Sequence, residues 1–465
     1  MSDPNSQQRL ARFLVEFPSA SITPAAREIA RLSLLDTLAV ALAGRNETAS
    51  RLARGYTRAM RQDQGATAWL TGEPHLPEAA ALFNAVAAHA LDYDDVTQAW
   101  RGHPGAVIWP ALWAAGQIGR STFGELLDAY ALGFEVGAQI GAAITAHHYP
   151  AGWHATSTVG ILAAAAACSR TLKLDAREAS HALGLAVAQS AGVQANFGTL
   201  AKPFQAGFAA CGALRAALLA KAGVDASCRA LEGPTSFGSL YGATHAIPLA
   251  LPERDAGADL AIARIGIEIK QFPNCYAAHR AIEAALALRA RIDSPSASHV
   301  RAILIEGTPS AHAPLLDRLP VNADEARFSI EFGVACALAD GALRLDSFTD
   351  QALQRPDIRK LMSSMQVRES LQSDGTRTAC VSITLADGRQ LAQRMADLPC
   401  RYGQPAFMQR LLEKVADCLR HAGLSDKSQA LFDDIIQAQA AADLHCVAGN
   451  TFQAIFSAHH RAATR

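Results

Sequence analysis

Three basic side chains stand just before, or a few residues from, a proline: His103, Lys202 and Lys270. A residue before proline is pushed out of the right-handed helical region, and proline is favoured at the first position of a helix. We therefore expect His103 and Lys202 on loops at helix N-termini, where backbone N–H groups and the helix dipole favour anions. Cationic side chains at such places predict a site for a small, multiply charged anion, such as a di- or tricarboxylate.

The densest run of reactive side chains is HHYPAGWHATST (147–158), which contains His147, His148 and His154. The apolar run 159–168 that follows is typical of a buried helix. A polar, aromatic loop attached to a packed helix is a natural place to hold a substrate, but taken alone the stretch fits a surface loop with structural histidines equally well. Beside the basic residues above, it predicts one wall of an anion-binding cleft. We expect His154 to belong to that site and His147 and His148 to be structural.

An acidic run, Asp92-Tyr93-Asp94-Asp95, precedes His103. We expect Asp94 and Asp95 to be helix-terminal acids that solvate a loop, and Asp92 to orient an imidazole or to act as a base. Carboxylates and imidazoles are also hard-metal ligands. However, the nearby cationic residues would crowd a metal ion, and no spaced ligand motif is present. We therefore predict no metal.

The composition narrows the class of protein. The chain has 465 residues, is 50% hydrophobic and carries a formal net charge of −1, which favours large folded cores and argues against nucleic-acid binding. The start MSDPNSQQRL has no signal-peptide pattern and no apolar run suggests a membrane span, so we expect a cytoplasmic protein. None of the nine cysteines forms a C-x-x-C pair, which argues against a zinc ribbon or a disulfide framework. The chain has no dinucleotide fingerprint, P-loop or G-x-S-x-G motif, so we expect no nucleotide cofactor and no serine hydrolase.

Hydrophobic periodicity predicts two domains. Helical patterns are expected at 25–44, 77–89, 110–118, 121–144, 159–172, 176–191 and 203–223, and again at 277–290, 324–339, 406–422 and 427–442. Strand patterns are expected at 265–269, 300–306, 365–369 and 378–385, and Asp387-Gly388 predicts a hairpin with a type I′ turn. The fold class is therefore mainly α. We expect an all-helical domain (1–265 and 399–465) with an inserted α+β domain (266–398) that has an antiparallel sheet, and a ligand cleft between the two.

Six motifs occur in one order along the chain: HALDYDD, RGHP, AGWHATSTVG, GTLAKP, KQFPNCYAAH and EARFSIEF. In this order they resemble the MmgE/PrpD family, and the resemblance covers roughly residues 10–400. That family includes 2-methylcitrate dehydratase, cis-aconitate decarboxylase and iminodisuccinate epimerase. The resemblance implies a helical domain with an α+β lid, a homodimer, no cofactor, and chemistry on a small polycarboxylate.

Residue by residue, the resemblance places the family's site pattern on Asp92, His103, His154, Lys202 and Lys270. The chain departs from the decarboxylase pattern at two positions. Cys275 stands where the decarboxylase has a histidine, and Phe332 stands where it has a tyrosine. Both changes remove a proton-transfer group, which argues against decarboxylation. The RGHP, HYPAGWH and P-x-C-Y-A-x-H motifs are most similar to iminodisuccinate epimerase, and a dehydratase is the alternative.

The chemistry that the family shares would be removal of a proton from a carbon next to a carboxylate. Fixed cations stabilise the enolate-like charge that develops, and we expect Lys202, Lys270 and Arg101 to supply them. His103 and His154 are the acid and base candidates, because imidazole titrates near neutral pH.

Cys275 is either the second proton carrier or a thiol that lines the pocket. A catalytically silent, dimeric helical scaffold is the alternative from another class. It does not explain why so many ionisable residues stand beside prolines and helix starts.

Overall fold

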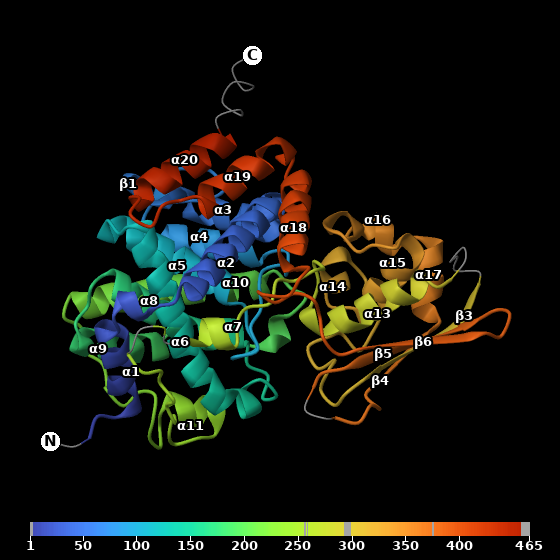
Figure 1. Cartoon of the computed structure of the whole chain (residues 1–465), viewed down its shortest axis with the longest axis horizontal. Helices are drawn as coiled ribbons and strands as arrows, with labels where there is room; N and C mark the ends of the chain where they lie inside the picture. The colour runs from blue at the N-terminus through green and yellow to red at the C-terminus, as the bar shows by residue number, and fades with distance from the viewer. Residues whose placement is uncertain (1–2, 255–256, 258, 293–298, 374–375, 457–465) are drawn as a thin grey trace, which may run out of the picture. The chain divides into compact units, whose positions relative to one another are not determined.

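The computed structural model describes residues 3–254, 257, 259–292, 299–373 and 376–456. It divides into two compact units (Figure 1). Unit 1 comprises Met1–Ala195, Leu200–Ile269 and Leu411–Arg465, and unit 2 comprises Asn196–Thr199 and Lys270–Arg410. The chain therefore leaves unit 1 near residue 270 and returns to it near 411, whereas the sequence patterns place these crossings near 266 and 399.

Unit 1 is built mainly from helices. In chain order these are α1 (Ser6–Glu16), α2 (Pro24–Ala43), α3 (Thr48–Thr57), α4 (Pro77–His89), α5 (Pro104–Gly119), α6 (Phe123–His148), α7 (Ala155–Thr158), α8 (Gly160–Thr171), α9 (Ala176–Val187), α10 (Ala201–Lys221), α11 (Phe237–Gly242) and α12 (Ala261–Arg264). The returning chain adds α18 (Phe407–His421), which starts before residue 411, then α19 (Ser428–Ile436) and α20 (Leu444–Phe456). Capping boxes begin several of them; at α6, Thr122 and Glu125 satisfy each other's backbone N–H groups.

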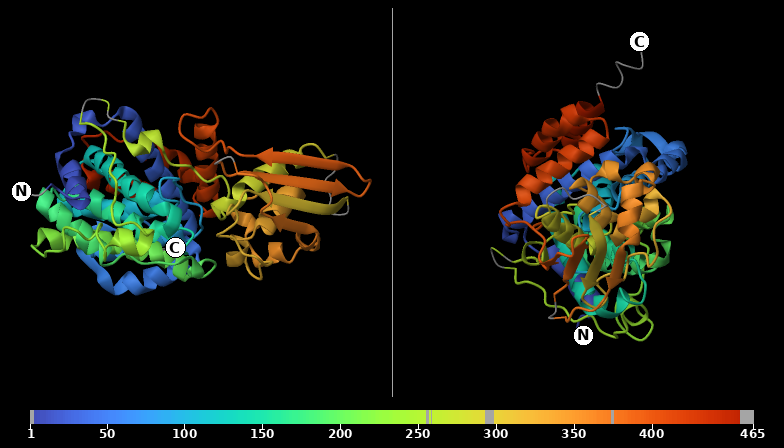
Figure 2. Two further views of the ribbon diagram at one scale, coloured as in Figure 1. Left: turned by 90° about the horizontal axis from the view of Figure 1, so that it is seen from below. Right: turned by 90° about the vertical axis from the view of Figure 1, so that its right-hand side faces the viewer.

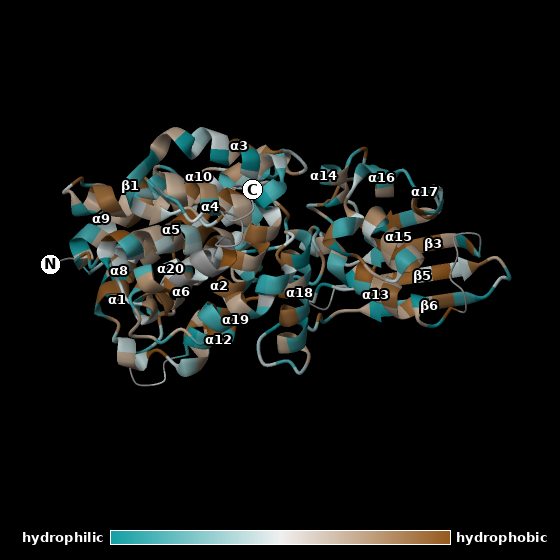
Figure 3. Cartoon of the chain, turned by 90° about the horizontal axis from the view of Figure 1, so that it is seen from above, coloured by the Kyte–Doolittle hydropathy of each residue, from teal (hydrophilic) through white to brown (hydrophobic). Residues whose placement is uncertain are grey.

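Small side chains let the inner helices approach closely, as the alanine content predicts. A Cβ atom added at Gly133 on α6 would lie 2.6 Å from the carbonyl oxygen of Ala163 on α8. α10 packs in the same way against α4, α8 and α9. Figure 3 shows brown and pale residues along α4, α5 and α6, as expected of helices that bury several faces.

Two sequence-based predictions for unit 1 are wrong. The all-helical expectation fails because β1 (Arg61–Thr67) and β2 (Pro74–His75) form a small antiparallel ribbon. The strand expected at 265–269 is not formed. Gly266 takes a φ of 78°, and Glu268 makes only an isolated antiparallel bridge with Val96. Pairing partners, which a local pattern does not contain, decide whether such a segment becomes a strand.

Two helix boundaries also differ from prediction, and both matter for the site. α5 starts at Pro104, not at 110, so Pro110 lies inside the helix. α6 continues to His148, four residues beyond the predicted end at 144. His148 is buried there against the rings of Trp153 and Tyr241, with ring centroids 5.9 Å away in each case. Much of the stretch 147–158 is therefore helical, with α7 occupying its last four residues.

Unit 2 pairs a four-stranded sheet with helices. The strands are β3 (Val300–Gly307), β4 (Met365–Arg368), β5 (Ala379–Leu385) and β6 (Gln390–Met395), in the order β4-β3-β5-β6. The helices are α13 (His279–Arg289), α14 (Ala323–Ala326), α15 (Ile330–Asp340), α16 (Asp350–Leu353) and α17 (Pro356–Ser363). Figure 2 shows helices gathered on one face of the sheet, and α13 contacts β5 and β6 directly. Along β5 every second residue is buried, as expected of a strand with one covered face.

The expected antiparallel sheet is corrected to a mixed one, because β4 runs parallel to β3. A helical crossover separates these two strands in the chain, and such a connection permits parallel pairing. The β5–β6 hairpin is confirmed. Its turn is closed by the Gly388 N–H donating to the Leu385 carbonyl, with Gly388 at a φ of 88°. Asp387 does not take the positive φ that a type I′ turn requires.

One described helix, α10, is long and apolar enough to cross a membrane by length and composition alone. Inside unit 1, 72% of its apolar window is buried, which is the behaviour of a core helix.

Candidate functional site

Four elements of unit 1 bring a cluster of ionisable side chains together. His89 is the last residue of α4, and Asp92 and Asp94 follow it. His103 is the N-cap residue of α5, as the His-Pro motif predicts. His154 is the N-cap residue of α7, and Lys202 lies in the first turn of α10, inside the helix and not on a loop before it. Apart from the slightly exposed His103, all these side chains are buried.

Asp94 joins two imidazoles. Its Oδ2 atom accepts a hydrogen bond from His89 Nδ1 at 2.8 Å and lies 3.2 Å from His103 Nδ1. Burial alone would raise the pKa of Asp94, but charge interactions and hydrogen bonds with His103 and His89 hold it well below its usual value. Burial lowers the pKa of His89 to about 4, so this ring is neutral and donates its Nδ1 proton to the carboxylate. The expectation that Asp94 solvates a loop is therefore wrong.

His154 is held in one tautomer. Its Nδ1 lies 2.8 Å from Oε1 of Gln205, while Nε2 of Gln205 donates to the Val193 carbonyl at 3.1 Å. Because the amide oxygen only accepts, Nδ1 of His154 carries the proton and Nε2 keeps its lone pair. Burial, with further contributions from His89 and Lys202, lowers the pKa of His154 well below its usual value. His154 is thus a neutral imidazole whose Nε2 can accept a proton.

Lys202 and Asp92 form a buried ion pair between Nζ and Oδ1. The same Oδ1 lies 3.7 Å from His103 Nε2, so the carboxylate of Asp92 stands between the ammonium and the imidazole. Asp92 takes a φ of 50°, a left-handed conformation that is unusual for a residue other than glycine. The ring centroid of His89 lies 4.7 Å from that of His103 and 5.6 Å from that of His154, so the three imidazoles are contiguous.

Asp95 is buried beneath the N-terminus of α5, whereas the sequence predicts a carboxylate that solvates a loop. Its Oδ1 accepts from the backbone N–H of Gly105 at 2.8 Å, and its Oδ2 accepts from Ser33 Oγ at 2.6 Å. Gly105 permits this contact, because a Cβ there would lie 2.8 Å from Oδ1. Burial, followed by the charge of Asp36, raises the pKa of Asp95 to about 8. Asp95 therefore caps the first turn of α5 as a neutral acid at pH 7.

The other predicted site residues are Arg101, Lys270 and Cys275. Arg101 belongs to unit 1, with its guanidinium 5.6 Å from the ring centroid of Tyr149. Lys270 and Cys275 belong to unit 2, where both are buried and the Cys275 N–H donates to the Arg327 carbonyl. Their part in the site stays a prediction.

Sequence reasoning missed three members of the cluster: His89, Asp94 and Gln205. Two signals were present in the sequence. His89 opens the HALDYDD motif and Asp94 is its sixth residue, and Gln205 lies three residues after Lys202, on the same face of α10.

The spacing of the acids and imidazoles would also suit a cation. Ligand atoms of His89, Asp92, Asp94 and His103 all lie within 4.8 Å of one another. The ammonium of Lys202 is already bonded to Asp92, which places a positive charge where a metal ion would have to enter. We therefore favour proton chemistry at this cluster.

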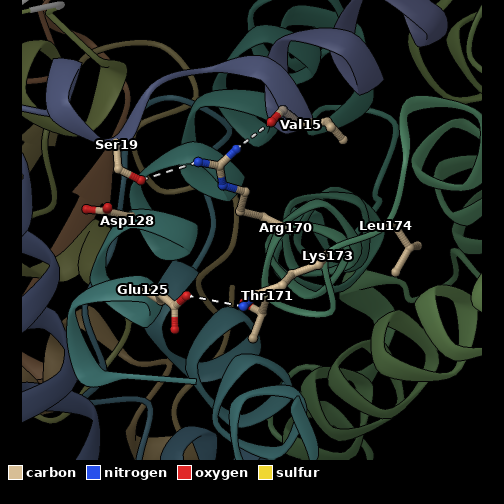
Figure 4. A pocket seen from close by; sticks show the side chains of 8 residues that line it. All are labelled: Val15, Ser19, Glu125, Asp128, Arg170, Thr171, Lys173 and Leu174. Atoms are coloured by element: carbon tan, nitrogen blue, oxygen red, sulfur yellow. Dashed lines mark hydrogen bonds and ion pairs between the residues drawn. The ribbon is translucent and has the colours of Figure 1, made fainter. Parts of the chain in front are cut away.

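Two cavities in the described part of unit 1 are lined by residues outside this cluster. One, of about 280 Å³, is lined by Arg170, Lys173, Glu125 and Asp128 among others (Figure 4). Opposite charges line it together, and Arg170 donates to the carbonyl oxygens of Val15 and Phe17 at the end of α1. The other, of about 640 Å³, is lined by exposed apolar side chains that include Tyr56, Leu76 and Phe208.

Comparison with known proteins agrees with the resemblance. Residues 8–249 match the model of the MmgE/PrpD N-terminal domain, and residues 272–439 match that of the C-terminal domain. The chain belongs to the MmgE/PrpD family. It is 30% identical to a cis-aconitate decarboxylase of Homo sapiens over 82% of this chain and 81% of the relative. It is 27% identical to a cis-aconitate decarboxylase of Aspergillus terreus over 73% of this chain and 74% of the relative. These relatives are enzymes, and none of them is named as an epimerase.

Proposed function

We propose that this chain is an enzyme that moves a proton at a carbon next to a carboxylate group of a small di- or tricarboxylate, with its own side chains as proton carriers. The observation that carries the proposal is the state of His154. A buried, neutral imidazole fixed by Gln205 keeps its Nε2 lone pair, beside a second imidazole and a lysine. A general base needs this protonation state, and a buried site strengthens the interactions that stabilise the anion that forms.

In the proposed reaction, Nε2 of His154 takes the proton from the carbon, and the electron pair of that bond spreads onto the adjacent carboxylate. Lys202 contributes positive charge where this negative charge grows. We further propose that Lys270 and Arg101 bind the remaining carboxylates.

His103 is the proposed partner acid. Its Nδ1 lies 3.2 Å from Oδ2 of Asp94, so the carboxylate orients the ring and leaves Nε2 to pass a proton to the substrate. Asp92, close to Nε2, would orient the ring and hold Lys202. Cys275 is the alternative second proton carrier.

Two classes of reaction are open at these proton carriers, and each has support. Epimerisation is favoured by the paired imidazoles and by the two departures from the decarboxylase pattern. Cys275 replaces a histidine, and Phe332 has no hydroxyl and is fully buried against Phe348, with ring centroids 5.4 Å apart. Iminodisuccinate is the substrate that this outcome suggests. Lyase chemistry is favoured by the decarboxylase relatives. In loss of water, as in a 2-methylcitrate dehydratase, His154 removes the proton and hydroxide leaves with a proton from the acid. In loss of carbon dioxide, the electron pair of the broken C–C bond stays on the carbon, and the acid His103 supplies the proton that this carbon takes up.

One experiment separates these outcomes. The purified protein is incubated in D₂O with iminodisuccinate, 2-methylcitrate or cis-aconitate, and the products are followed by proton NMR and chiral chromatography. Deuterium uptake with an unchanged carbon skeleton and inverted configuration indicates the epimerase. A new alkene indicates the dehydratase, and itaconate-type products with carbon dioxide indicate the decarboxylase. If neither exchange nor product arises with any polycarboxylate, the proposed function is wrong.

A further inference from the structure

A lysine from the C-terminal part of the chain contacts the backbone of the candidate site. Lys414 lies on α18, and its side chain is only 2% exposed. Its Nζ lies 2.6 Å from Oδ1 of Asp36 on α2 and donates to the carbonyl oxygen of Tyr93 at 2.5 Å. The ammonium also lies 4.3 Å from the ring centroid of Tyr93. One buried charge thus holds the peptide that separates Asp92 from Asp94.

The orientation of the Tyr93 peptide determines where the carboxylates of Asp92 and Asp94 lie. Asp92 is in a left-handed conformation, which the surrounding structure must maintain because a side chain disfavours it. Rotation of the Tyr93 peptide would swing the carboxylate on one side away from Lys202 and the carboxylate on the other side away from His103. The short contacts of the site therefore depend on the orientation of this one carbonyl group.

Stability alone is a poor reason for such an arrangement. Removing two charges from water is costly, and well-packed apolar residues often replace a buried ion pair without loss of stability. Two groups of the site segment contact this pair. The ring of Tyr93 provides a cation–π contact to the ammonium. Burial raises the pKa of Asp36 above its usual value, and the charge of Lys414 and a backbone hydrogen bond from Asp95 oppose that rise. The pair thus contacts Tyr93 and Asp95, two residues of the segment that carries the acids of the site.

We propose that Lys414 is a positioning residue: its ammonium, held by Asp36, fixes the Tyr93 carbonyl so that Asp92 and Asp94 present their carboxylates to Lys202 and His103. The proposal rests on the proposed function of this cluster for its catalytic consequence. Its structural part, the fixing of segment 91–96, does not depend on any activity.

The test compares a single and a double variant. Lys414→Met removes the ammonium at similar length and leaves the carboxyl group of Asp36 buried without its cation, so both stability and activity should fall. Asp36→Asn/Lys414→Met removes both charges and should recover the unfolding midpoint without restoring the bond to Tyr93. We expect the double variant to show kcat reduced about 10- to 100-fold with KM changed less than about 3-fold, because the orientation of catalytic groups is lost and the carboxylate clamp remains.

Hydrogen–deuterium exchange measured by mass spectrometry provides a readout that needs no substrate. Peptides covering 91–96 should exchange faster in both variants than in the wild type. Asp128→Asn is the matched control. It breaks the Arg27–Asp128 pair (2.6 Å) elsewhere in unit 1 and should leave kcat and the exchange of 91–96 unchanged.

The proposal is overturned if the double variant recovers wild-type kcat, or if it exchanges at 91–96 like the wild type. Lys414 would then be only half of a structural ion pair. If the wild type itself turns over none of the polycarboxylates, the proposed function fails while the exchange measurement still decides the role of Lys414.

Discussion

At the scale of single residues, the site depends on which nitrogen of each imidazole carries the proton. Gln205 sets this for His154, and Asp94 sets it for His89 and His103. Neither partner is a proton carrier itself. Each determines whether a ring presents a lone pair or a proton to a substrate, and this difference separates a base from an acid.

His154→Ala should therefore lower kcat by about 10²- to 10⁴-fold, the usual contribution of one general base. Steady-state kinetics on whichever polycarboxylate proves to be the substrate would measure this. His147→Ala is the matched control, because His147 is an exposed histidine in the same stretch. Full activity of the His154 variant would remove this residue from the mechanism.

Asp94→Asn should keep the shape of the side chain and reverse one of its hydrogen bonds. The amide N–H group would face an N–H group of a ring, so His103 or His89 would have to adopt the other tautomer. We expect kcat to fall by up to about 10⁴-fold, as when the orienting aspartate of a catalytic triad is replaced. Asp95→Asn, the same exchange at the next residue, should leave kcat near the wild-type value. Equal losses in both variants would mean that the substitutions act through general damage to the segment.

At the scale of elements, the N-terminus of α5 is fixed before any substrate binds. Pro104 starts the helix, His103 precedes it in an extended conformation, and Asp95 accepts a hydrogen bond from its first turn. The sequence predicts the first two of these features, because proline restricts both its own φ and its predecessor. It does not predict the third, because the cap comes from a residue outside the helix.

Asp95→Asn provides a stability test of that cap. In the folded protein the pKa of Asp95 is about 8, above the usual value of 3.8, so the folded state binds this proton more tightly than the unfolded state. The wild type therefore loses stability through this group as the pH rises from about 4 to 8. The asparagine keeps the oxygen that Gly105 needs and does not titrate. The free energy of unfolding of the variant minus that of the wild type, both measured in urea, should increase as the pH rises from 5 to 8. A constant difference would contradict the raised pKa.

At the scale of the whole molecule, buried histidines link folding to pH. Burial lowers the pKa of His89 and of His148 to about 4 and holds that of His154 well below its usual value. In the unfolded chain these rings take up protons near pH 6.5. The contribution of these buried, neutral rings to the free energy of unfolding is therefore fully present above pH 6.5 and is lost as the pH falls.

The free energy of unfolding should thus fall between pH 6.5 and 4, with each histidine contributing up to about 1.4 kcal/mol per pH unit. Urea unfolding at successive pH values would measure the slope. His148→Gln, which removes one of the three groups, should make the slope shallower by about that amount. An unchanged slope would mean that His148 is not buried in its neutral form.

The homodimer implied by the family resemblance stays a prediction. We expect light scattering coupled to size exclusion to give twice the mass of one chain. The exposed apolar side chains around the 640 Å³ cavity are the surface that we expect to be covered. Phe208→Glu, at a side chain 60% exposed, should then shift the protein towards the monomer, whereas Leu240→Glu, 67% exposed on α11, should not.

The sequence predicts the parts of this molecule that follow from local rules. Most long helices, the β5–β6 hairpin and the placement of His103 follow from periodicity, turn residues and proline geometry. The predictions from the sequence that fail concern non-local contacts. The parallel pairing of β4 with β3, the missing strand at 265–269 and the buried states of Asp94 and Asp95 are set by partners far along the chain or by tertiary burial.

The contact between Lys414 and Tyr93 joins residues 321 positions apart, and this has a consequence during synthesis. A ribosome makes the acids and imidazoles of the site long before it makes the lysine that holds their segment. Until α18 emerges, Asp36 has no ammonium beside it, and the segment 91–96 lacks this restraint. Unit 2, by contrast, is almost continuous in sequence and can complete its own core first. If Lys414 has the proposed role, α18, which is made late, completes a site whose acids and imidazoles were made much earlier.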